Sequence, residues 1–248
     1  MTHSPKPSAV LATAFFLLML HSCIVVDDES NTFVPCQEGS GQVETTKFER
    51  PPFTGIELRG DVDVFFSQGP EQEIEARGHT NLLEELILEV DGQDLEIRTR
   101  RCISPRDRLQ LFITIPQIDR VVNSSAADIV SENTLVTNNI ELTASGSGNV
   151  EIAIITDVLK ANLSGSGNLL AEGEAATLNL KITGSGDFNG FGLVAVSSMV
   201  FISGSGDAEV FAQDFLEASI SGSGDVFYKG DPFLEVRLTG SGRVIDAN

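Results

Sequence analysis

The stretch "SGSGD" at 203–207 decides the fold, because close copies of it recur through the second half of the chain. Glycine loses more conformational freedom on folding than other residues do, about 0.5–1 kcal/mol relative to alanine. A chain that repeats paired glycines therefore needs a particular backbone shape at each copy. The first glycines of the six Gly-Ser-Gly copies lie 18 to 20 residues apart, at Gly146, Gly165, Gly184, Gly204, Gly222 and Gly240.

Each copy follows a segment in which apolar and polar residues alternate. The residues two, four and six positions before the first glycine are apolar in every copy except at Ser198. Residues two apart share one face of a β-strand, so every repeat offers the same inward face. The three inward columns run from Ile140, Leu142 and Ala144 in the first copy to Leu234, Val236 and Leu238 in the last.

Stacking of these repeats predicts an all-β fold, a right-handed parallel β-helix with coils of about 18–21 residues. A single strand cannot bury its apolar face alone, whereas successive repeats spaced about 4.8 Å apart close a continuous core. The hexapeptide period of left-handed helices is not visible, which favours the right-handed form. The segments "SSAAD" at 124–128 and "LRGDVDV" at 58–64 are interpreted as divergent earlier corners.

The corner explains the glycines. The chain bends there while the next coil lies only one strand spacing away, so we expect the glycines to allow positive φ and close backbone approach. In the first half, Leu88 and Val90, the turn "DGQD" at 91–94, then Leu95 and Ile97 predict a hairpin. Residues 81–86 predict one helical turn with Asn81 as its N-cap.

The N-terminus predicts export. Residues 9–20 form an apolar run too short to span a bilayer, and Leu20-His21-Ser22-Cys23 resembles a bacterial lipobox. The resemblance implies lipid chains on Cys23, a membrane partner through that anchor, and, because Ile24 follows, the outer membrane of a Gram-negative cell envelope. An ordinary secretory signal is the alternative. We therefore divide the chain into a lipoprotein signal peptide (1–22), an acidic tether (23–46) and a β-helix domain (47–248).

The two remaining cysteines, Cys36 and Cys102, would lie in an oxidising compartment, where one disulfide between them is possible. Two free buried thiols are the alternative. Because only one His, His79, lies outside the signal, these residues do not form a recognisable metal site. The formal net charge of -20 argues against a nucleic-acid partner, which requires a basic face.

The acidic residues after the corners raise the possibility of calcium. Asp187, Asp207 and Asp225 follow consecutive corners and would stack in register, and oxygen ligands suit calcium. The alternative, which we favour, is a solvated turn in which each side chain bonds local backbone. No other cofactor is predicted, and no set of catalytic residues can be placed in one cleft.

Residues from about 47 to 245 resemble the family described as putative auto-transporter adhesin, head GIN domain. The resemblance rests on "FTGIELRGDVDVFFSQG" at 53–69, on "DGQDLEIRTRRCISPRDRLQLFITIPQIDRV" at 91–121, and on the serial corners. It implies a right-handed β-helix and a role in cell adhesion, with no established catalytic residues. The "RGD" at 59–61 is interpreted as strand context rather than as an integrin motif.

The sequence therefore predicts a non-enzymatic, lipid-anchored envelope protein that binds a surface glycan or protein through one face of the β-helix. The outward column Thr143, Asn162, Lys181, Phe201, Ser219 and Arg237 and the Gly-Ser-Gly ridge are the candidate faces. Met199 and Phe201 interrupt the outward polarity and are the first candidate contacts. A carbohydrate-active β-helix enzyme and a purely structural envelope protein are the alternatives.

Overall fold

The computed structural model describes residues 35–248. Contacts divide the chain into two units, Met1–Pro35 and Cys36–Asn248, and the second carries the hydrophobic core. We therefore treat Cys36–Asn248 as an independently folding unit. The expected signal peptide, the lipidation site Cys23 and the first part of the tether lie outside the described residues. None of the helices described is both long and apolar enough to span a bilayer.

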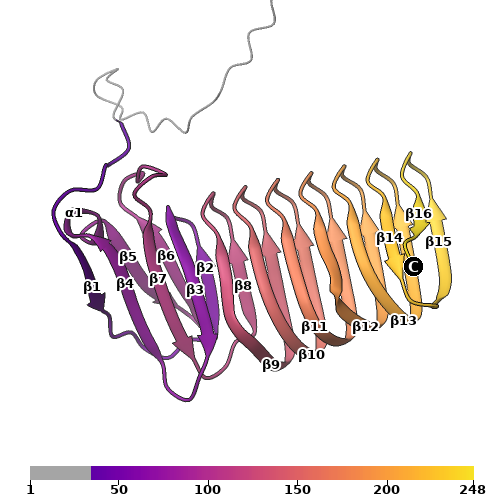
Figure 1. Cartoon of the computed structure of the whole chain (residues 1–248), viewed down its shortest axis with the longest axis horizontal. Helices are drawn as coiled ribbons and strands as arrows, with labels where there is room; N and C mark the ends of the chain where they lie inside the picture. Colours follow the sequence, from indigo (N-terminus) through magenta and orange to yellow (C-terminus); the bar gives the residue numbers. More distant parts are fainter. Residues whose placement is uncertain (1–34) are drawn as a thin grey trace, which may run out of the picture. The chain divides into compact units, whose positions relative to one another are not determined.

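The second half of this unit is a stack of parallel strands (Figure 1). Its long strands are β9 (Ile129–Ala144), β10 (Val150–Leu163), β11 (Leu169–Ile182), β12 (Phe188–Ile202) and β13 (Ala208–Ile220). The next coil divides into β14 (Val226–Lys229) and β15 (Phe233–Leu238), and β16 (Val244–Asp246) begins a further coil on β14.

The pairing register follows the sequence period. Val150 pairs with Leu169, Phe188 with Ala208, and Val226 with Val244. Each coil therefore lies on its own copy, and the predicted all-β parallel β-helix is confirmed. Since neighbouring coils carry equivalent residues, one local pattern specifies both the strand and the surface on which it packs.

The inward columns form the core. From Ile140 to Ile220 every member is at most 2% exposed, and burying a side chain such as leucine contributes about 1.5–3 kcal/mol. The column that follows the corners is buried as well, at Val150, Leu169, Phe188, Ala208 and Val226. In β15 the same columns are exposed, at 37% for Leu234, 40% for Val236 and 48% for Leu238.

Close backbone approach, not backbone handedness, explains the corner glycines. A Cβ added to Gly204 would lie 2.0 Å from the carbonyl oxygen of Gly184 in the preceding coil. Within the described residues, positive φ occurs only at Gly41, Gly92, Gly173 and Gly230, none of which belongs to the six corner copies between Gly146 and Gly242. The expectation of positive φ was therefore wrong, because at these corners the Cβ direction points along the stack into the neighbouring backbone.

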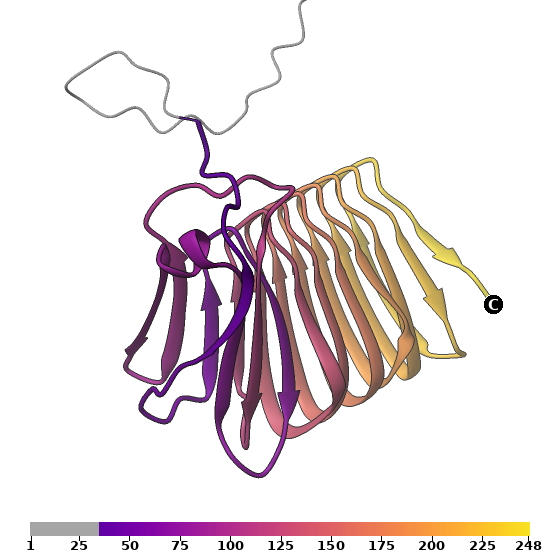
Figure 2. The same ribbon diagram turned by 60° about the vertical axis from the view of Figure 1, so that its left-hand side comes forward.

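The first coils do not follow the order of the sequence (Figure 2). The coil of β2 (Gly55–Leu58) and β3 (Val62–Gln68) lies between that of β6 (Asp94–Thr99) and β7 (Leu109–Ile115) and that of β8 (Arg120–Asn123) and β9. The "LRGDVDV" corner stacks on the "SSAAD" corner, where the Ser124 amide donates to the Leu58 carbonyl at 2.9 Å.

Antiparallel strands close the N-terminal end of the unit. β4 (Glu73–His79) pairs with β7 and β1 (Val43–Lys47) pairs with β4, while β5 (Leu86–Asp91) forms the predicted hairpin with β6. Residues 36–46, which the sequence assigns to the acidic tether, are held at this end by β1 pairing and a disulfide.

The predicted helical turn exists as α1 (Thr80–Leu83), but its N-cap is His79, not Asn81. Asn81 is the second residue of the helix, and its side-chain amide forms hydrogen bonds with two backbone groups of the N-terminal segment. It accepts from the Ser40 amide at 2.7 Å and donates to the Glu38 carbonyl at 2.9 Å. A long-range tie therefore replaces the expected local cap.

Ser198 is the one polar residue of the inward columns, and it yields a stability prediction. It is fully buried between Leu178 and Leu216, and its hydroxyl has no partner among residues 35–248. An unsatisfied buried hydroxyl costs about 1–3 kcal/mol. We expect Ser198→Ala in Cys36–Asn248 to stabilise the fold by about 1 kcal/mol, a rise in Tm of about 2–4 °C.

Thermal unfolding followed by circular dichroism measures this effect. Ser197→Ala, one residue along the same strand and only half-buried, is the matched control and should leave Tm unchanged. An unchanged or lower Tm for Ser198→Ala would show that the hydroxyl has a compensating partner.

Candidate binding groove on the outer sheet face

A groove of about 590 Å³ runs across the outward face of the sheet formed by β10, β11, β12, β13 and β15. Alternate residues of these strands point away from the core, so outward columns stack just as the inward ones do. The groove is lined by Lys160, Asn162, Asn179, Leu180, Lys181, Met199, Val200, Phe201, Glu217, Ser219 and Arg237.

Met199 and Phe201 lie on the middle strand of the groove, β12. They are 40% and 41% exposed, although both are large and apolar. On one side Asn179 pairs with Met199 and Lys181 with Phe201, and on the other side stand Glu217 and Ser219. The structure thus brings the two predicted contact residues into one concave surface between polar neighbours.

Three cationic side chains border the groove in a chain of formal net charge -20. Lys160 pairs with Glu141 at 2.7 Å, and Arg237 pairs with Glu235 and, at 3.7 Å, with Glu217. Lys181 forms no ion pair with any side chain of the described chain. The groove therefore combines apolar contact area, amide groups and at least one uncompensated positive charge.

One of the two columns that line the groove was predicted from the sequence. Asn162, Lys181, Phe201, Ser219 and Arg237 belong to the outward column named there. The contributions of Lys160, Asn179 and Glu217 were missed. The sequence did contain a signal for them, because each stands two residues before a member of the predicted column and therefore lies on the same outward face of its strand.

The residue after each corner forms a second feature, a hydrogen-bonded ladder along the stack. Each Oδ1 accepts the backbone N–H of the equivalent residue in the next coil, at 2.7–3.2 Å. Asp and Asn both offer this oxygen, which accounts for their exchange among the copies. In order, the ladder is Asp63, Asp128, Asn149, Asn168, Asp187, Asp207, Asp225 and Arg243.

Arginine side chains stand at both ends of this ladder. Arg108 bonds Asp63 at 3.1 Å, and Arg243 pairs with Asp225 at 2.5 Å. The side-chain hydrogen bond from Arg243 lowers the pKa of Asp225 below its usual value. The exposed ion pair itself contributes little stability in water.

The ladder assigns a structural role to the predicted calcium ligands. Asp187, Asp207 and Asp225 do stack in register, and one oxygen of each accepts a backbone amide. Among residues 35–248, no group of three or more His, Cys, Asp or Glu side chains converges as a metal site would require. The solvated-turn interpretation expected each side chain to bond backbone of its own turn. In the structure, the amide that each carboxylate accepts belongs to the next coil. Calcium at these corners stays an untested hypothesis.

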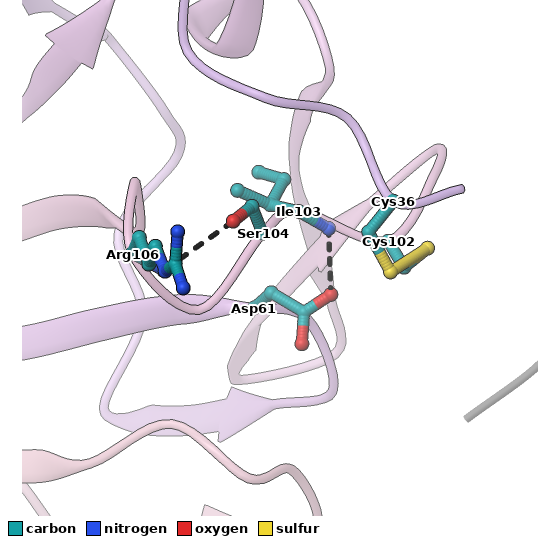
Figure 3. The surroundings of a disulfide bond; sticks show 6 residues. All are labelled: Cys36, Asp61, Cys102, Ile103, Ser104 and Arg106. Carbon is teal, nitrogen blue, oxygen red and sulfur yellow. Dashed lines mark hydrogen bonds between the residues drawn. A yellow bond between two sulfur atoms is a disulfide. The ribbon is translucent and has the colours of Figure 1, made fainter. Parts of the chain in front are cut away.

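Cys36 and Cys102 form the predicted disulfide (Figure 3). It fastens the N-terminal segment to the loop before β7, and backbone bonds from Gln37 to Cys102 and from Ser104 to Gln37 reinforce it. Next to it, the carboxylate of Asp61 accepts the Ile103 amide at 3.0 Å. The acid of the "RGD" segment, which lies in the corner between β2 and β3 and not in a strand, therefore serves an internal contact.

With this geometry in place, the comparisons identify the family. The family model described as "Putative auto-transporter adhesin, head GIN domain" matches residues 52–232. The chain belongs to this family. No curated protein matches the chain significantly. The family description places the protein among adhesin-like proteins of the cell surface or envelope.

Solved structures share the fold of this head GIN domain. A "putative adhesin" from Bacteroides fragilis has a TM-score of 0.80 at 22% identity, covering 85% of this chain and 99% of its own. A "putative lipid binding protein" from Parabacteroides distasonis has a TM-score of 0.71 at 22% identity, covering 86% and 100%. A "putative adhesin" from Parabacteroides merdae has a TM-score of 0.71 at 20% identity, covering 87% and 100%.

Proposed function

We propose that this head GIN domain is a non-enzymatic adhesin that binds a surface glycan through the groove around Phe201. The observation that carries the proposal is the exposure of Met199 and Phe201 in a concave surface edged by amide and cationic groups. An aromatic ring offers apolar area to a sugar face, and Asn side chains both donate and accept hydrogen bonds.

The charge of the groove favours a glycan with acidic substituents. Lys160 and Lys181 would attract carboxylate or sulfate groups at short range, although the net charge of the chain repels anions at long range. Screening at physiological salt reduces that long-range repulsion, because the Debye length is then about 8 Å.

A glycan-array comparison of Cys36–Asn248 with its Phe201→Ser variant tests the proposal. We expect the variant to bind roughly tenfold more weakly, because truncating a central aromatic contact typically costs over 1 kcal/mol. Val196→Ser is the matched control, since Val196 lies on the same strand and is 42% exposed but does not line the groove. Equal binding by wild type and Phe201→Ser would refute the assignment of the groove. Binding to surface proteins and not to glycans would assign it to a protein partner.

We also propose that the protein is anchored in the outer membrane by lipid on Cys23. The support is the sequence Leu20-His21-Ser22-Cys23 after an apolar run, together with the adhesin-like family. In cells, the full chain should fractionate with membranes, and Cys23→Ser should move it to the soluble fraction. Membrane association that survives Cys23→Ser would contradict the anchor.

A further inference from the structure

β15 is an open edge of the solenoid. It pairs with β13 on one side, and no strand of the described chain pairs with its other side. Figure 1 shows it at the yellow end of the stack together with β16, which pairs with β14 and not with β15. Three inward residues of β15, Leu234, Val236 and Leu238, are 37–48% exposed, whereas the equivalent residues from Ile140 to Ile220 are buried. Phe233 of the same strand is 72% exposed.

The opposite end of the solenoid is protected. Its edge strands are β5, which pairs only with β6 and whose Leu88 carbonyl accepts a hydrogen bond from Arg50 at 2.8 Å, and β1, which has the sequence "VETTK" and runs antiparallel to β4. Lys47 of this strand pairs with Glu73 and Glu75, so charge and polar side chains cover the edge. Native proteins blunt edge strands in this way to prevent further pairing. β15 lacks such protection, which singles out this end as a site for strand addition.

The free backbone groups of β15 belong to its apolar residues. The amide of Thr239, directly after the strand, donates to the Ile220 carbonyl of β13 at 2.9 Å. Backbone groups alternate in direction along a strand, so those of Glu235 and Arg237 also point toward β13. The N–H and C=O groups of Leu234, Val236 and Leu238 therefore point away from the solenoid.

The sequence of β15, "FLEVRL", is complementary to itself in an antiparallel arrangement. An antiparallel partner must place residues with free backbone groups opposite each other. Centring the pairing on Val236 sets Val236 opposite its own counterpart and Leu234 opposite Leu238. On the outward face the same register sets Glu235 of each copy opposite Arg237 of the other copy, which gives two pairs of opposite charge.

Charge selects this register over its neighbours. Centring on Glu235 would set two glutamates opposite each other, and centring on Arg237 would set two arginines opposite each other. Like charges directly opposite are destabilising, whereas opposite charges contribute about 0.2–1 kcal/mol per pair. Only the Val236 register combines apolar contact on the inward face with attraction on the outward face.

We propose that β15 is the interface to a second copy of this chain, formed by antiparallel pairing about a two-fold axis through Val236. Such an interface is isologous, because each residue contacts its complement in the same patch of the partner. It satisfies the free backbone groups of the edge and covers the exposed ends of the three inward columns.

The pairing would also join two binding faces. A two-fold axis perpendicular to the sheet keeps the outward faces of both copies on one side, so the two grooves lie along one continuous sheet. Two sites on one rigid body raise avidity for a surface that repeats its ligand. The interface itself does not depend on what the groove binds.

Charge exchange tests the proposal. Sedimentation analysis of Cys36–Asn248 should show a dimer for the wild type. Glu235→Arg and Arg237→Glu should each weaken association roughly tenfold, because two symmetric pairs change from attraction to repulsion. An equimolar mixture of these two variants should restore the dimer, since each glutamate then faces an arginine. The double variant Glu235→Arg/Arg237→Glu should dimerise alone.

Three results would contradict this interface. Circular dichroism and Tm serve as the folding control for each variant, and we expect all of them to be folded because the substituted side chains are exposed. A monomeric wild type would overturn the proposal and leave the edge to a different partner. A dimer that is indifferent to the single exchanges, or not rescued by mixing them, would overturn the Val236 register and β15 as the interface.

Discussion

Gly204→Ala is expected to destabilise the solenoid by about 3 kcal/mol or more, lowering the Tm of Cys36–Asn248 by about 6–12 °C or more. The added Cβ would lie 2.0 Å from the Gly184 carbonyl oxygen and 2.7 Å from the backbone of Thr183. Both contacts are with backbone of the coil beneath, so no side-chain rotation relieves them. Only a shift of two stacked coils can, which disturbs the hydrogen bonds between them.

Two control variants isolate this steric mechanism. Ser205→Ala changes an exposed side chain in the same corner and should leave Tm unchanged. Gly92→Ala meets no atom within 4 Å but has φ of +62°, so it should cost only about 1–2 kcal/mol of backbone strain. Thermal unfolding of the three variants measures the difference, and a Gly204→Ala protein that melts with the wild type would refute the backbone-contact mechanism.

Breaking the disulfide is the second large effect. Cys36 and Cys102 are 66 residues apart in sequence. The loop-entropy relation for a closure of this length gives about 4 kcal/mol, and losses of about 2–5 kcal/mol are typical of native disulfides. We expect the Cys36→Ser/Cys102→Ser variant of Cys36–Asn248 to unfold at lower denaturant concentration, with the N-terminal segment released first.

Denaturant unfolding with and without reductant measures the loss, and hydrogen exchange locates it. Amides of residues 36–47 should exchange faster after reduction, because Gln37 and β1 are joined to the solenoid only at its edge. The double variant should be insensitive to reductant, which controls for other effects of the reagent. Identical unfolding of the oxidised and reduced wild type would show that strand pairing alone holds the segment.

The repeat that predicts the fold also predicts part of the candidate groove, because it shows which side chains point outward. Met199 and Phe201 were recognisable because they interrupt an otherwise polar column, and both line the groove. The ladder was only half visible in the sequence. The stacked positions of Asp187, Asp207 and Asp225 could be read, but their amide partners lie one coil away and follow from tertiary stacking.

By itself, the sequence determined the coil length, the inward columns from Ile140 to Ile220 and the need for glycine at the corners. It could do so because each coil packs on its own copy, so a local period also describes the tertiary contact. Only the tertiary structure decided that the β2 and β3 coil lies between the β6 and β7 coil and the β8 and β9 coil, that Asn81 ties the N-terminal segment, and that β15 is left open. These features depend on pairings between unlike segments, which leave no period in the sequence.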